Sequence, residues 1–467
     1  MAFPALIRPL SGFWIALGVM AALNALFAMA WNEPVMVVAF LTLSLLCVFF
    51  AGMVLLLTRG LSSRAGTSDA LVLGLLVWIS GPLLAALPFL STPQFTFEQA
   101  VFEAVSAFTT TGAILHPPEA LPQSLVFWRH LLAGLGGLVT LIMATALLAA
   151  LDRNGPGVRR SFLLTLNPDN VFAHLPIAAR RIAMVYGVMI LVVAGLLILD
   201  GQTGPDALAF ALSGLSTAGL MPFSGALGDD LSGFGLFVLA VASLAGALNI
   251  AIFWDALRDR RALLDPDLAA LAVMVLALAL VFMIVDMDHV FDRVFDAIFI
   301  VTTSGWQIHE GQIPVPVAAL FAVLIGGAAA STAGGVKVSR VFLLWWRMGA
   351  ELNKLMDPSG IQRVKFRGRH VADSLLITIW SYVLGFAAVL GLGGLLVALQ
   401  GVSFEPAFSV TVAALSNTGP LFAQTGEGHA WSTLPKPVYH ILIPVMILGR
   451  LEVLAGLAAI WALVIRR

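Results

Sequence analysis

Four short strings of the same type recur in the sequence, and their backbone and side chains could bind a cation. They are TTTGA (109–113), STAGL (216–220), TTSGW (302–306) and SNTGP (416–420), which align on Gly112, Gly219, Gly305 and Gly419. Glycine reaches the left-handed backbone region without a Cβ penalty, so consecutive carbonyls can turn toward one axis. A ring of carbonyls can replace the hydration shell of an ion, and Ser or Thr adds hydroxyl oxygen without charge. The strings therefore predict a cation site made of main-chain oxygen.

Each string follows a short, moderately apolar stretch that must position it. Apolar residues stand four, seven and eleven positions before each glycine, which is the stripe of one helix face. The stretches are too short to cross a bilayer, so we expect four re-entrant helices whose negative C-terminal ends face the site. For a single string, a small-residue packing motif is the alternative. Four copies in the same register favour four turns that meet at a pore axis, where non-helical backbone is tolerated inside a membrane.

The composition excludes a water-soluble chain. Of 467 residues, 60% are hydrophobic and 11% charged, whereas an ordinary soluble domain carries about 25% charged residues. The formal net charge of −1 argues against nucleic-acid binding. A single cysteine, Cys47, excludes a disulfide framework within the chain and a cysteine-based metal cluster. The eight histidines have no metal-ligand spacing, and we expect no organic cofactor.

Ten apolar runs are long enough to span a membrane. They lie near 11–31, 35–57, 70–90, 125–151, 180–199, 233–256, 268–285, 314–347, 373–399 and 437–465. Twenty of the 25 Lys and Arg residues fall in alternate loops or tails, which predicts cytoplasmic termini by the positive-inside rule. The first run has no evident cleavage site and is expected to be a retained helix.

The expected fold class is an all-α polytopic membrane protein. Four pseudo-repeated helix–pore loop–helix units surround a central pore, and an extra transmembrane helix pair precedes them. The predicted divisions are the N-terminal pair at 1–66, the first unit at 67–160, the second at 161–262, the third at 263–356, with an interrupted inner helix, and the fourth at 357–467.

Two features lie apart from the strings. Glycine pairs at 326–327 and 334–335 disfavour a continuous helix in the eighth span, so we expect a flexible loop there, with a small-residue helix contact as the open alternative. Arg450 lies deep in the last span, where a charge is a functional candidate. We hypothesise that Arg450 projects toward the pore beneath the strings and binds loop carbonyls or acts as an electrostatic barrier. A structural tie to a neighbouring helix is the alternative.

With these motifs, the sequence resembles the Trk/Ktr/HKT superfamily of potassium transporters, and most closely its TrkH branch. The resemblance rests on the four strings, on GGAAASTAGGVKVSR (326–340), on LGRLE (448–452) and on the N-terminal helix pair. It implies a homodimer with one pore per protomer, a cytosolic nucleotide-binding regulatory ring of the TrkA type, and a bacterial inner membrane location. It also implies that the 326–340 region obstructs the pore until the ring moves it.

The resemblance assigns residues to these roles, with K+ as the transported ion. The expected filter residues are Thr109, Thr110, Thr111, Gly112, Ser216, Thr217, Ala218, Gly219, Thr302, Thr303, Ser304, Gly305, Ser416, Asn417, Thr418 and Gly419. The residues expected to bind K+ are Thr110, Thr111, Thr217, Ala218, Thr303, Ser304, Asn417 and Thr418. The expected gate residues are Gly326, Gly327, Gly334, Gly335, Lys337 and Arg450.

Particular positions bear on selectivity. In the plant relatives, Ser in place of the first filter glycine goes with sodium transport, so Gly112 favours potassium. The chain departs from the family pattern at Leu421, where a glycine is usual, at Trp306, and at Ala330, where a further glycine is usual.

The expected function is potassium transport without chemical catalysis, gated by the intramembrane loop and a separate cytosolic subunit. A secondary active transporter coupling cation and solute movement is the alternative, and it predicts two related halves rather than four units. A membrane enzyme would need clustered acid, base or nucleophile side chains, which the spans scarcely offer. The basic residues Arg363, Lys365, Arg367 and Arg369 could bind anionic lipid headgroups or the regulatory ring.

Overall fold

The structure, a computed structural model, is built almost entirely from helices. It describes residues 3–61, 67–151, 171–256, 259–260, 264–357, 365–366, 369–370, 373–451 and 453–465. The α-helices are α1 (Phe3–Ala30), α2 (Pro34–Leu57), α3 (Thr67–Ala85), α4 (Phe97–Phe108), α5 (Gln123–Leu151), α6 (Val171–Leu199), α7 (Gly204–Ser216), α8 (Leu227–Asp230), α9 (Gly233–Ala247), α10 (Ile250–Ala256), α11 (Pro266–Val285), α12 (Val290–Val301), α13 (Pro316–Ile325), α14 (Val338–Met356), α15 (Asp373–Ala398), α16 (Phe404–Leu415), α17 (Gly419–Gln424), α18 (Lys436–Arg450) and α19 (Val453–Ile465).

Short elements complete the fold. Single 3-10 turns lie at η1 (Phe89–Ser91), η2 (Pro118–Ala120) and η5 (Trp431–Thr433), and the two-residue strands β1 (Lys365–Phe366) and β2 (Arg369–His370) pair antiparallel. Arg363 and Arg367 of the predicted basic stretch lie outside the described residues. So do the predicted unit boundaries at 66, 160 and 262, whereas α14 ends at Met356, the predicted end of the third unit.

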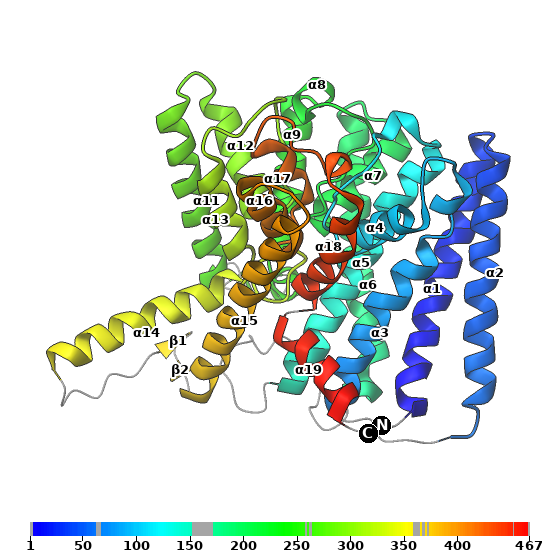
Figure 1. Ribbon diagram of the computed structural model, residues 1–467, viewed down its shortest axis with the longest axis horizontal. Helices are drawn as coiled ribbons and strands as arrows, with labels where there is room; N and C mark the ends of the chain where they lie inside the picture. Colours follow the sequence, from blue (N-terminus) through cyan, green and yellow to red (C-terminus); the bar gives the residue numbers. More distant parts are fainter. Residues whose placement is uncertain are drawn as a thin grey trace.

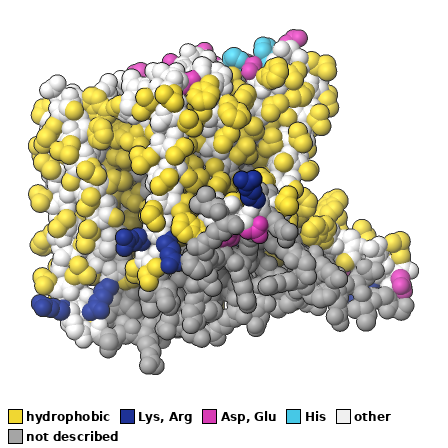
Figure 2. Space-filling view, turned by 180° about the vertical axis from the view of Figure 1, so that it is seen from behind, with side chains coloured by type: hydrophobic (Ala, Val, Ile, Leu, Met, Phe, Trp, Pro, Cys, Tyr) yellow, Lys and Arg dark blue, Asp and Glu magenta, His cyan; other side chains and the backbone are white. Residues whose placement is uncertain are grey.

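Long apolar helices stand side by side across the molecule (Figure 1). Among the described residues, seven helices are long and apolar enough to cross a membrane, and the number rises to nine if each of two bent pairs is one span. Figure 2 shows a broad apolar band, with Lys and Arg near one edge and acidic residues and histidines at the other. A contiguous apolar band of this size is typical of a surface that faces lipid.

The structure interrupts three of the ten predicted spans, and the sequence analysis anticipated one of these breaks. The break between α13 and α14 covers the predicted glycine-rich loop. The other two breaks were not predicted: within 233–256, α9 and α10 meet at 101°, and within 437–465, α18 and α19 meet at 109°. At the first bend, Asn249 Oδ1 accepts a hydrogen bond from the Ala251 amide at 2.9 Å, which starts a new helix as an N-cap does.

The four stretches before the strings form the short helices α4, α7, α12 and α16, as predicted from their periodicity. Each is 12 or 13 residues long and carries an acid in its first turn. These acids are Glu98, Asp206, Asp292 and Glu405. A carboxylate near a helix N-terminus is stabilised by the helix dipole. The four helices therefore run from an acidic entrance toward the strings.

Candidate cation site

The four strings meet in a closed ring. A Cβ built on each of the first three glycines would collide with or crowd the next string, and the amide of the fourth glycine donates to a carbonyl of the first string. In order, the neighbours are Gly112 with Ala218, Gly219 with Ser304, Gly305 with Thr418, and Gly419 with Thr111. Each string thus contacts the next, and the fourth contacts the first. All sixteen predicted filter residues are buried.

The backbone alternates in handedness through the strings. Three glycines are left-handed, Gly112 with φ 73° and Gly219 and Gly305 with φ 68°. The residue two positions before each glycine is also left-handed, which the sequence analysis did not predict. These residues are Thr110 (φ 55°), Thr217 (φ 56°), Thr303 (φ 62°) and Asn417 (φ 52°). Such a conformation costs a non-glycine residue about 1–3 kcal/mol and persists only where the surroundings impose it.

The fourth glycine departs from the expected left-handed conformation. Gly419 is the first residue of α17, and Pro420 follows it within the first turn of that helix. Proline fits there because the first helical amides have no intrahelical acceptor. The string thus turns directly into a helix, and Leu421, one of the noted departures, is buried within α17.

At the ends of the short helices, string amides donate hydrogen bonds to carbonyls of the preceding helix. The amides of Thr111, Ala218 and Thr418 donate to carbonyls five residues earlier, at 2.8, 2.9 and 2.8 Å. Bonds of this type close an α-helix at its C-terminus. Within the described part of the chain, the carbonyls of the left-handed Thr and Asn residues accept no hydrogen bond. Those oxygens therefore remain available to a desolvated cation.

Two side chains hold the outer carbonyls of the ring, and the sequence analysis missed both. Gln424 Nε2 donates to the Gly305 carbonyl, and Trp431 Nε1 donates to the Gly419 carbonyl at 2.9 Å. Gln424 ends α17 and Trp431 begins η5. These donors lie in the connection after the fourth string, where no residue spacing repeated that of the other units.

The glycine-rich loop at 326–337 closes on itself. The amides of Val336 and Lys337 donate to the Leu324 and Ile325 carbonyls, both at 2.8 Å. They therefore cap the end of α13. Of the predicted gate glycines, Gly326 and Gly335 are left-handed, and a Cβ on Gly326 or Gly327 would strike the opposite arm of the loop. Ala330 is also left-handed, with φ 57°, a conformation that favours the glycine usual in the resembled family.

The loop lies directly against three of the strings. The Gly334 amide donates to Thr303 Oγ1 at 2.9 Å, and Thr217 Oγ1 donates to the Thr332 carbonyl at 3.0 Å. A Cβ on Gly334 would also strike the Ser416 carbonyl oxygen. The second, third and fourth strings are thus in contact with the loop.

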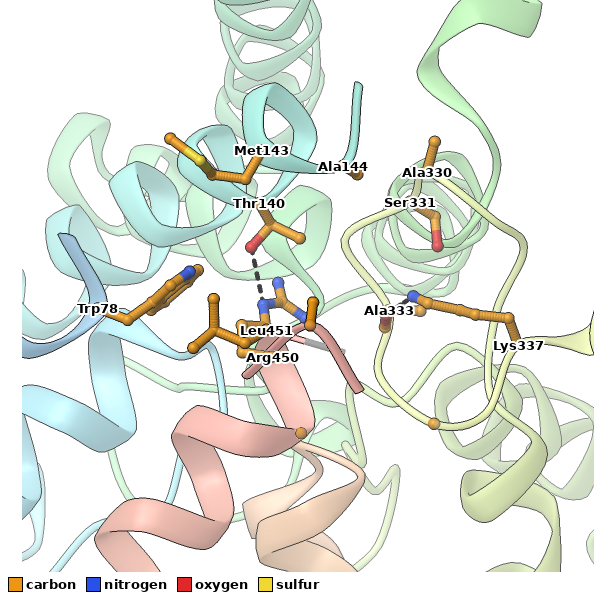
Figure 3. Close-up of a pocket in the computed structure, with 13 residues that line it drawn as sticks. Trp78, Thr140, Met143, Ala144, Ala330, Ser331, Ala333, Lys337, Arg450 and Leu451 are labelled. Carbon is orange, nitrogen blue, oxygen red and sulfur yellow. Dashed lines mark hydrogen bonds between the residues drawn. The ribbon is translucent and has the colours of Figure 1, made fainter. Parts of the chain in front are cut away.

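Arg450 joins this loop to the helix after the first string. Its guanidinium donates to the Thr332 carbonyl and, through Nε, to Thr140 Oγ1 of α5 at 2.8 Å. Lys337 Nζ donates to the Ala333 carbonyl of the same loop. Figure 3 shows both basic side chains beside a cavity of about 40 Å³ that Trp78, Thr140 and Ser331 also line.

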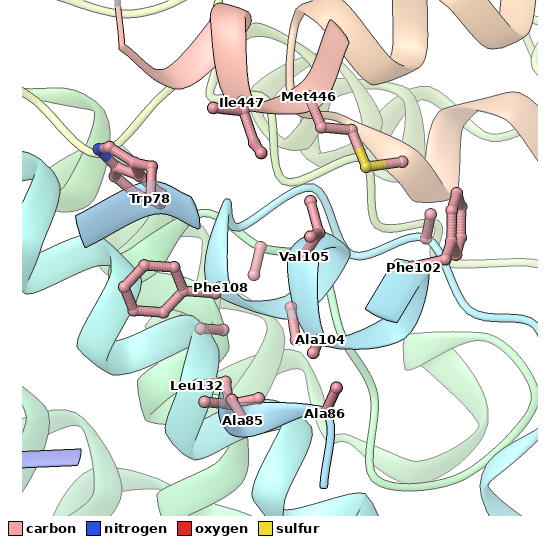
Figure 4. Packing of buried hydrophobic residues seen from close by; sticks show 14 of the residues in the cluster. Trp78, Ala85, Ala86, Phe102, Ala104, Val105, Phe108, Leu132, Met446 and Ile447 are labelled. Carbon is pink, nitrogen blue, oxygen red and sulfur yellow. The ribbon is translucent and has the colours of Figure 1, made fainter. Parts of the chain in front are cut away.

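The first string is positioned by a dense apolar cluster (Figure 4). Phe108 is the last residue of α4, and its ring centroid lies 4.8 Å from that of Trp78. The ring centroids of Phe102 and Tyr439 are 4.9 Å apart. Gly136 of α5 adds a contact that the sequence analysis missed, because a Cβ there would collide with the Phe108 carbonyl. Gly246 and Gly449 approach the equivalent carbonyls in the second and fourth units. In the sequence, this contact could have been inferred from a glycine in the middle of the span that follows the string.

Comparison with known proteins finds relatives that share these features. The family model of TrkH, described as a cation transport protein, matches residues 266–461. The Trk system potassium uptake protein TrkH of Salmonella typhimurium is 27% identical over 412 residues, which cover 84% of each chain. The protein of the same name from Vibrio parahaemolyticus is 26% identical over 465 residues, covering 93% of this chain and 96% of that one.

The fold also matches a solved structure. The crystal structure of the potassium transporter TrkH from Vibrio parahaemolyticus superposes with a TM-score of 0.87 at 24% identity, covering 98% of both chains. The predicted fold class, an all-α polytopic membrane protein, is confirmed. The chain is thus similar to TrkH cation transport proteins in sequence and in fold.

Proposed function

We propose that this protein transports potassium across a membrane through the ring of four strings. The observation that carries the proposal is the closed order of contacts among the strings, together with unpartnered carbonyls at the left-handed residues. Neutral oxygens arranged around an axis can replace the water of a potassium ion. The potassium uptake named in the relatives agrees with this chemistry, which needs no catalytic step.

Within this proposal, each string supplies K+ ligands from its second and third residues. These are Thr110, Thr111, Thr217, Ala218, Thr303, Ser304, Asn417 and Thr418. The four helix–pore loop–helix units at 67–160, 161–262, 263–356 and 357–467 each contribute one string. The acids in the first turns of α4, α7, α12 and α16 attract cations to the entrance.

The loop at 326–337 is the proposed gate. It lies against the strings through Gly334 and Thr332, and Arg450 donates to the same Thr332 carbonyl. The two arms of the loop pack closely against each other at Gly326, Gly327 and Gly335, which carry no Cβ. A positive guanidinium at this position opposes the passage of a cation. Movement of the loop and Arg450 would therefore open the path.

The protein is proposed to act in a bacterial inner membrane with both termini in the cytoplasm. The ends of α1 and α19 lie at the same face of the molecule (Figure 1), and basic residues gather at that edge (Figure 2), as the positive-inside rule expects. Trk system relatives support a regulatory partner. We propose a nucleotide-binding ring of the TrkA type, bound at this face to a homodimer.

The direct test is potassium uptake in bacteria that lack their own potassium transporters. Cells that make the protein are expected to grow at low external potassium and to show net K+ uptake, with Na+ uptake much slower. Membrane vesicles from the same cells should carry K+ flux under defined gradients. Protein present in the membrane without K+ uptake, together with saturable uptake of an organic solute, would contradict the proposal.

A further inference from the structure

Two buried carboxylates stand behind the ring and have no part in the proposed function so far. Glu103 of α4 and Asp296 of α12 each lie nine residues before a filter glycine. Their exposures are 1% and 5%. A buried carboxylate is unfavourable unless it is paired and hydrogen-bonded. The partners of these two groups therefore indicate what they stabilise.

Both carboxylates accept hydrogen bonds from the backbone that follows a filter string. Glu103 Oε1 accepts a hydrogen bond from the Leu115 amide at 2.6 Å, and Asp296 Oδ1 accepts one from the Ile308 amide at 3.4 Å. Leu115 and Ile308 each stand three residues after a filter glycine. The same contact thus occurs at equivalent positions in the first and third units.

Each carboxylate is in turn oriented by an arginine. Arg129 Nη2 of α5 lies 2.9 Å from Glu103 Oε1 and also donates to the His116 carbonyl at 3.0 Å. Arg293 Nη1 lies 2.8 Å from Asp296 Oδ2. A charged hydrogen bond to a fixed arginine limits the positions open to the carboxylate.

The second and fourth units have no acid at this position. Phe210 and Val410 stand nine residues before Gly219 and Gly419. Since the strings contact one another in the order first, second, third, fourth, the two acid-bearing units face each other across the ring. Carboxylates therefore fix the backbone that follows the first and third strings, on opposite sides of the ring.

We propose that Glu103 and Asp296 are positioning residues that fix the outer half of the filter and so maintain its preference for potassium. This inference rests on the proposed function. The first and third filter segments are each fixed at the inner end by hydrogen bonds back to the preceding helix and at the outer end by a carboxylate. Releasing the outer end lets the carbonyls between the two ends move toward a smaller ion, which weakens discrimination against sodium.

The test compares the K+ to Na+ flux ratio of full-length variants. Asp296→Ala removes the acceptor for Ile308, while Arg293 keeps Asp286 as a partner, with Nε to Oδ2 at 3.0 Å. Loss of one charged hydrogen bond corresponds to roughly a tenfold fall in the ratio. Glu103→Gln keeps an acceptor oxygen for Leu115 and is expected to give a smaller fall. Total K+ flux per protein molecule should change less than the ratio.

The matched control is Glu119→Gln. Glu119 is an outer acid that accepts a hydrogen bond from the Ser224 hydroxyl, and not from the backbone three residues after a filter glycine. Its flux ratio is expected to equal that of the wild type. Folded Asp296→Ala protein with the wild-type ratio would overturn the inference. An equal fall in the control would overturn it too, because the effect would then be one of surface charge.

Hydrogen exchange separates this inference from the proposed function. The Leu115 and Ile308 amides should exchange slowly in the wild type, and Ile308 should exchange at least tenfold faster in Asp296→Ala. Rapid exchange at both amides in the wild type would show that the carboxylates do not fix the backbone after the strings, whatever the ion flux. A wild-type chain that moves no potassium but protects both amides would refute the proposed function and the selectivity role with it, and would leave the fixing intact.

Discussion

Adding one methyl group at Gly112 tests the ring most directly. Gly112 has φ 73°, and a Cβ built there lies 1.8 Å from the Ala218 carbonyl oxygen of the next string. Real Cβ atoms essentially never approach within 3.0 Å, so Gly112→Ala must displace a predicted K+ ligand by more than an ångström. The left-handed backbone adds about 1–3 kcal/mol of strain for a residue with a Cβ.

The expected result is a selective loss of function rather than of folding. If a strain of about 1.4 kcal/mol falls on the ion-bound filter, K+ binding weakens about tenfold. We therefore expect Gly112→Ala to lower K+ uptake by tenfold or more and to reduce the K+ to Na+ ratio. The assay is uptake in cells lacking potassium transporters, normalised to the protein present in the membrane.

Gly391→Ala is the matched control. Gly391 lies within α15, and nothing is within 4 Å of a Cβ built there. Alanine favours a helix interior over glycine by about 1 kcal/mol, so this variant should transport normally and unfold at the wild-type temperature or above. Wild-type uptake and selectivity in Gly112→Ala would refute the reasoning, because the strings would then not form a shared ion site.

Three further predictions concern the loop and the outer surface. Ala330→Gly relieves a left-handed alanine (φ 57°), which is worth about 1 kcal/mol, and should raise the melting temperature by about one degree for a chain of 467 residues; an unchanged or lower value would contradict this. Arg450→Gln removes the charge that holds the Thr332 carbonyl and should raise cation flux without changing the K+ to Na+ ratio, whereas wild-type flux would remove Arg450 from the mechanism. The hydrogen bond from the Ser224 side chain lowers the pKa of Glu119 from its ordinary value of 4.5, so the stability it provides is present above that pH and is lost as pH falls through the lowered pKa. Thermal unfolding of Ser224→Ala should therefore depend less on acid pH than that of the wild type.

Local repetition explains how much of the filter could be predicted. The apolar stripe before each string predicted α4, α7, α12 and α16, and the aligned glycines predicted left-handed backbone that three of them adopt. The left-handed Thr110 and Thr303 could not be predicted, because a β-branched residue rarely adopts that conformation by itself. Packing of the neighbouring strings and the loop imposes it.

Long-range contacts explain what the sequence could not provide. Hydropathy predicted apolar spans over 233–256 and 437–465 but carries no information about a sharp bend within them, and both helices bend. The glycine pairs predicted a break between α13 and α14 without indicating its contacts. The bond from Gly334 to Thr303 joins residues 31 positions apart, and no periodicity links those positions.

The loop contacts the strings both through hydrogen bonds and through close backbone packing. The loop is held to the strings by two neutral hydrogen bonds, from Gly334 to Thr303 and from Thr217 to Thr332, each worth about 1 kcal/mol. Gly334 of the loop also packs against the Ser416 carbonyl as closely as the filter glycines pack against the next string, so a side chain fits at neither place. In the proposed mechanism, a regulatory subunit must therefore supply the free energy that releases both the hydrogen bonds and this close packing before the path opens.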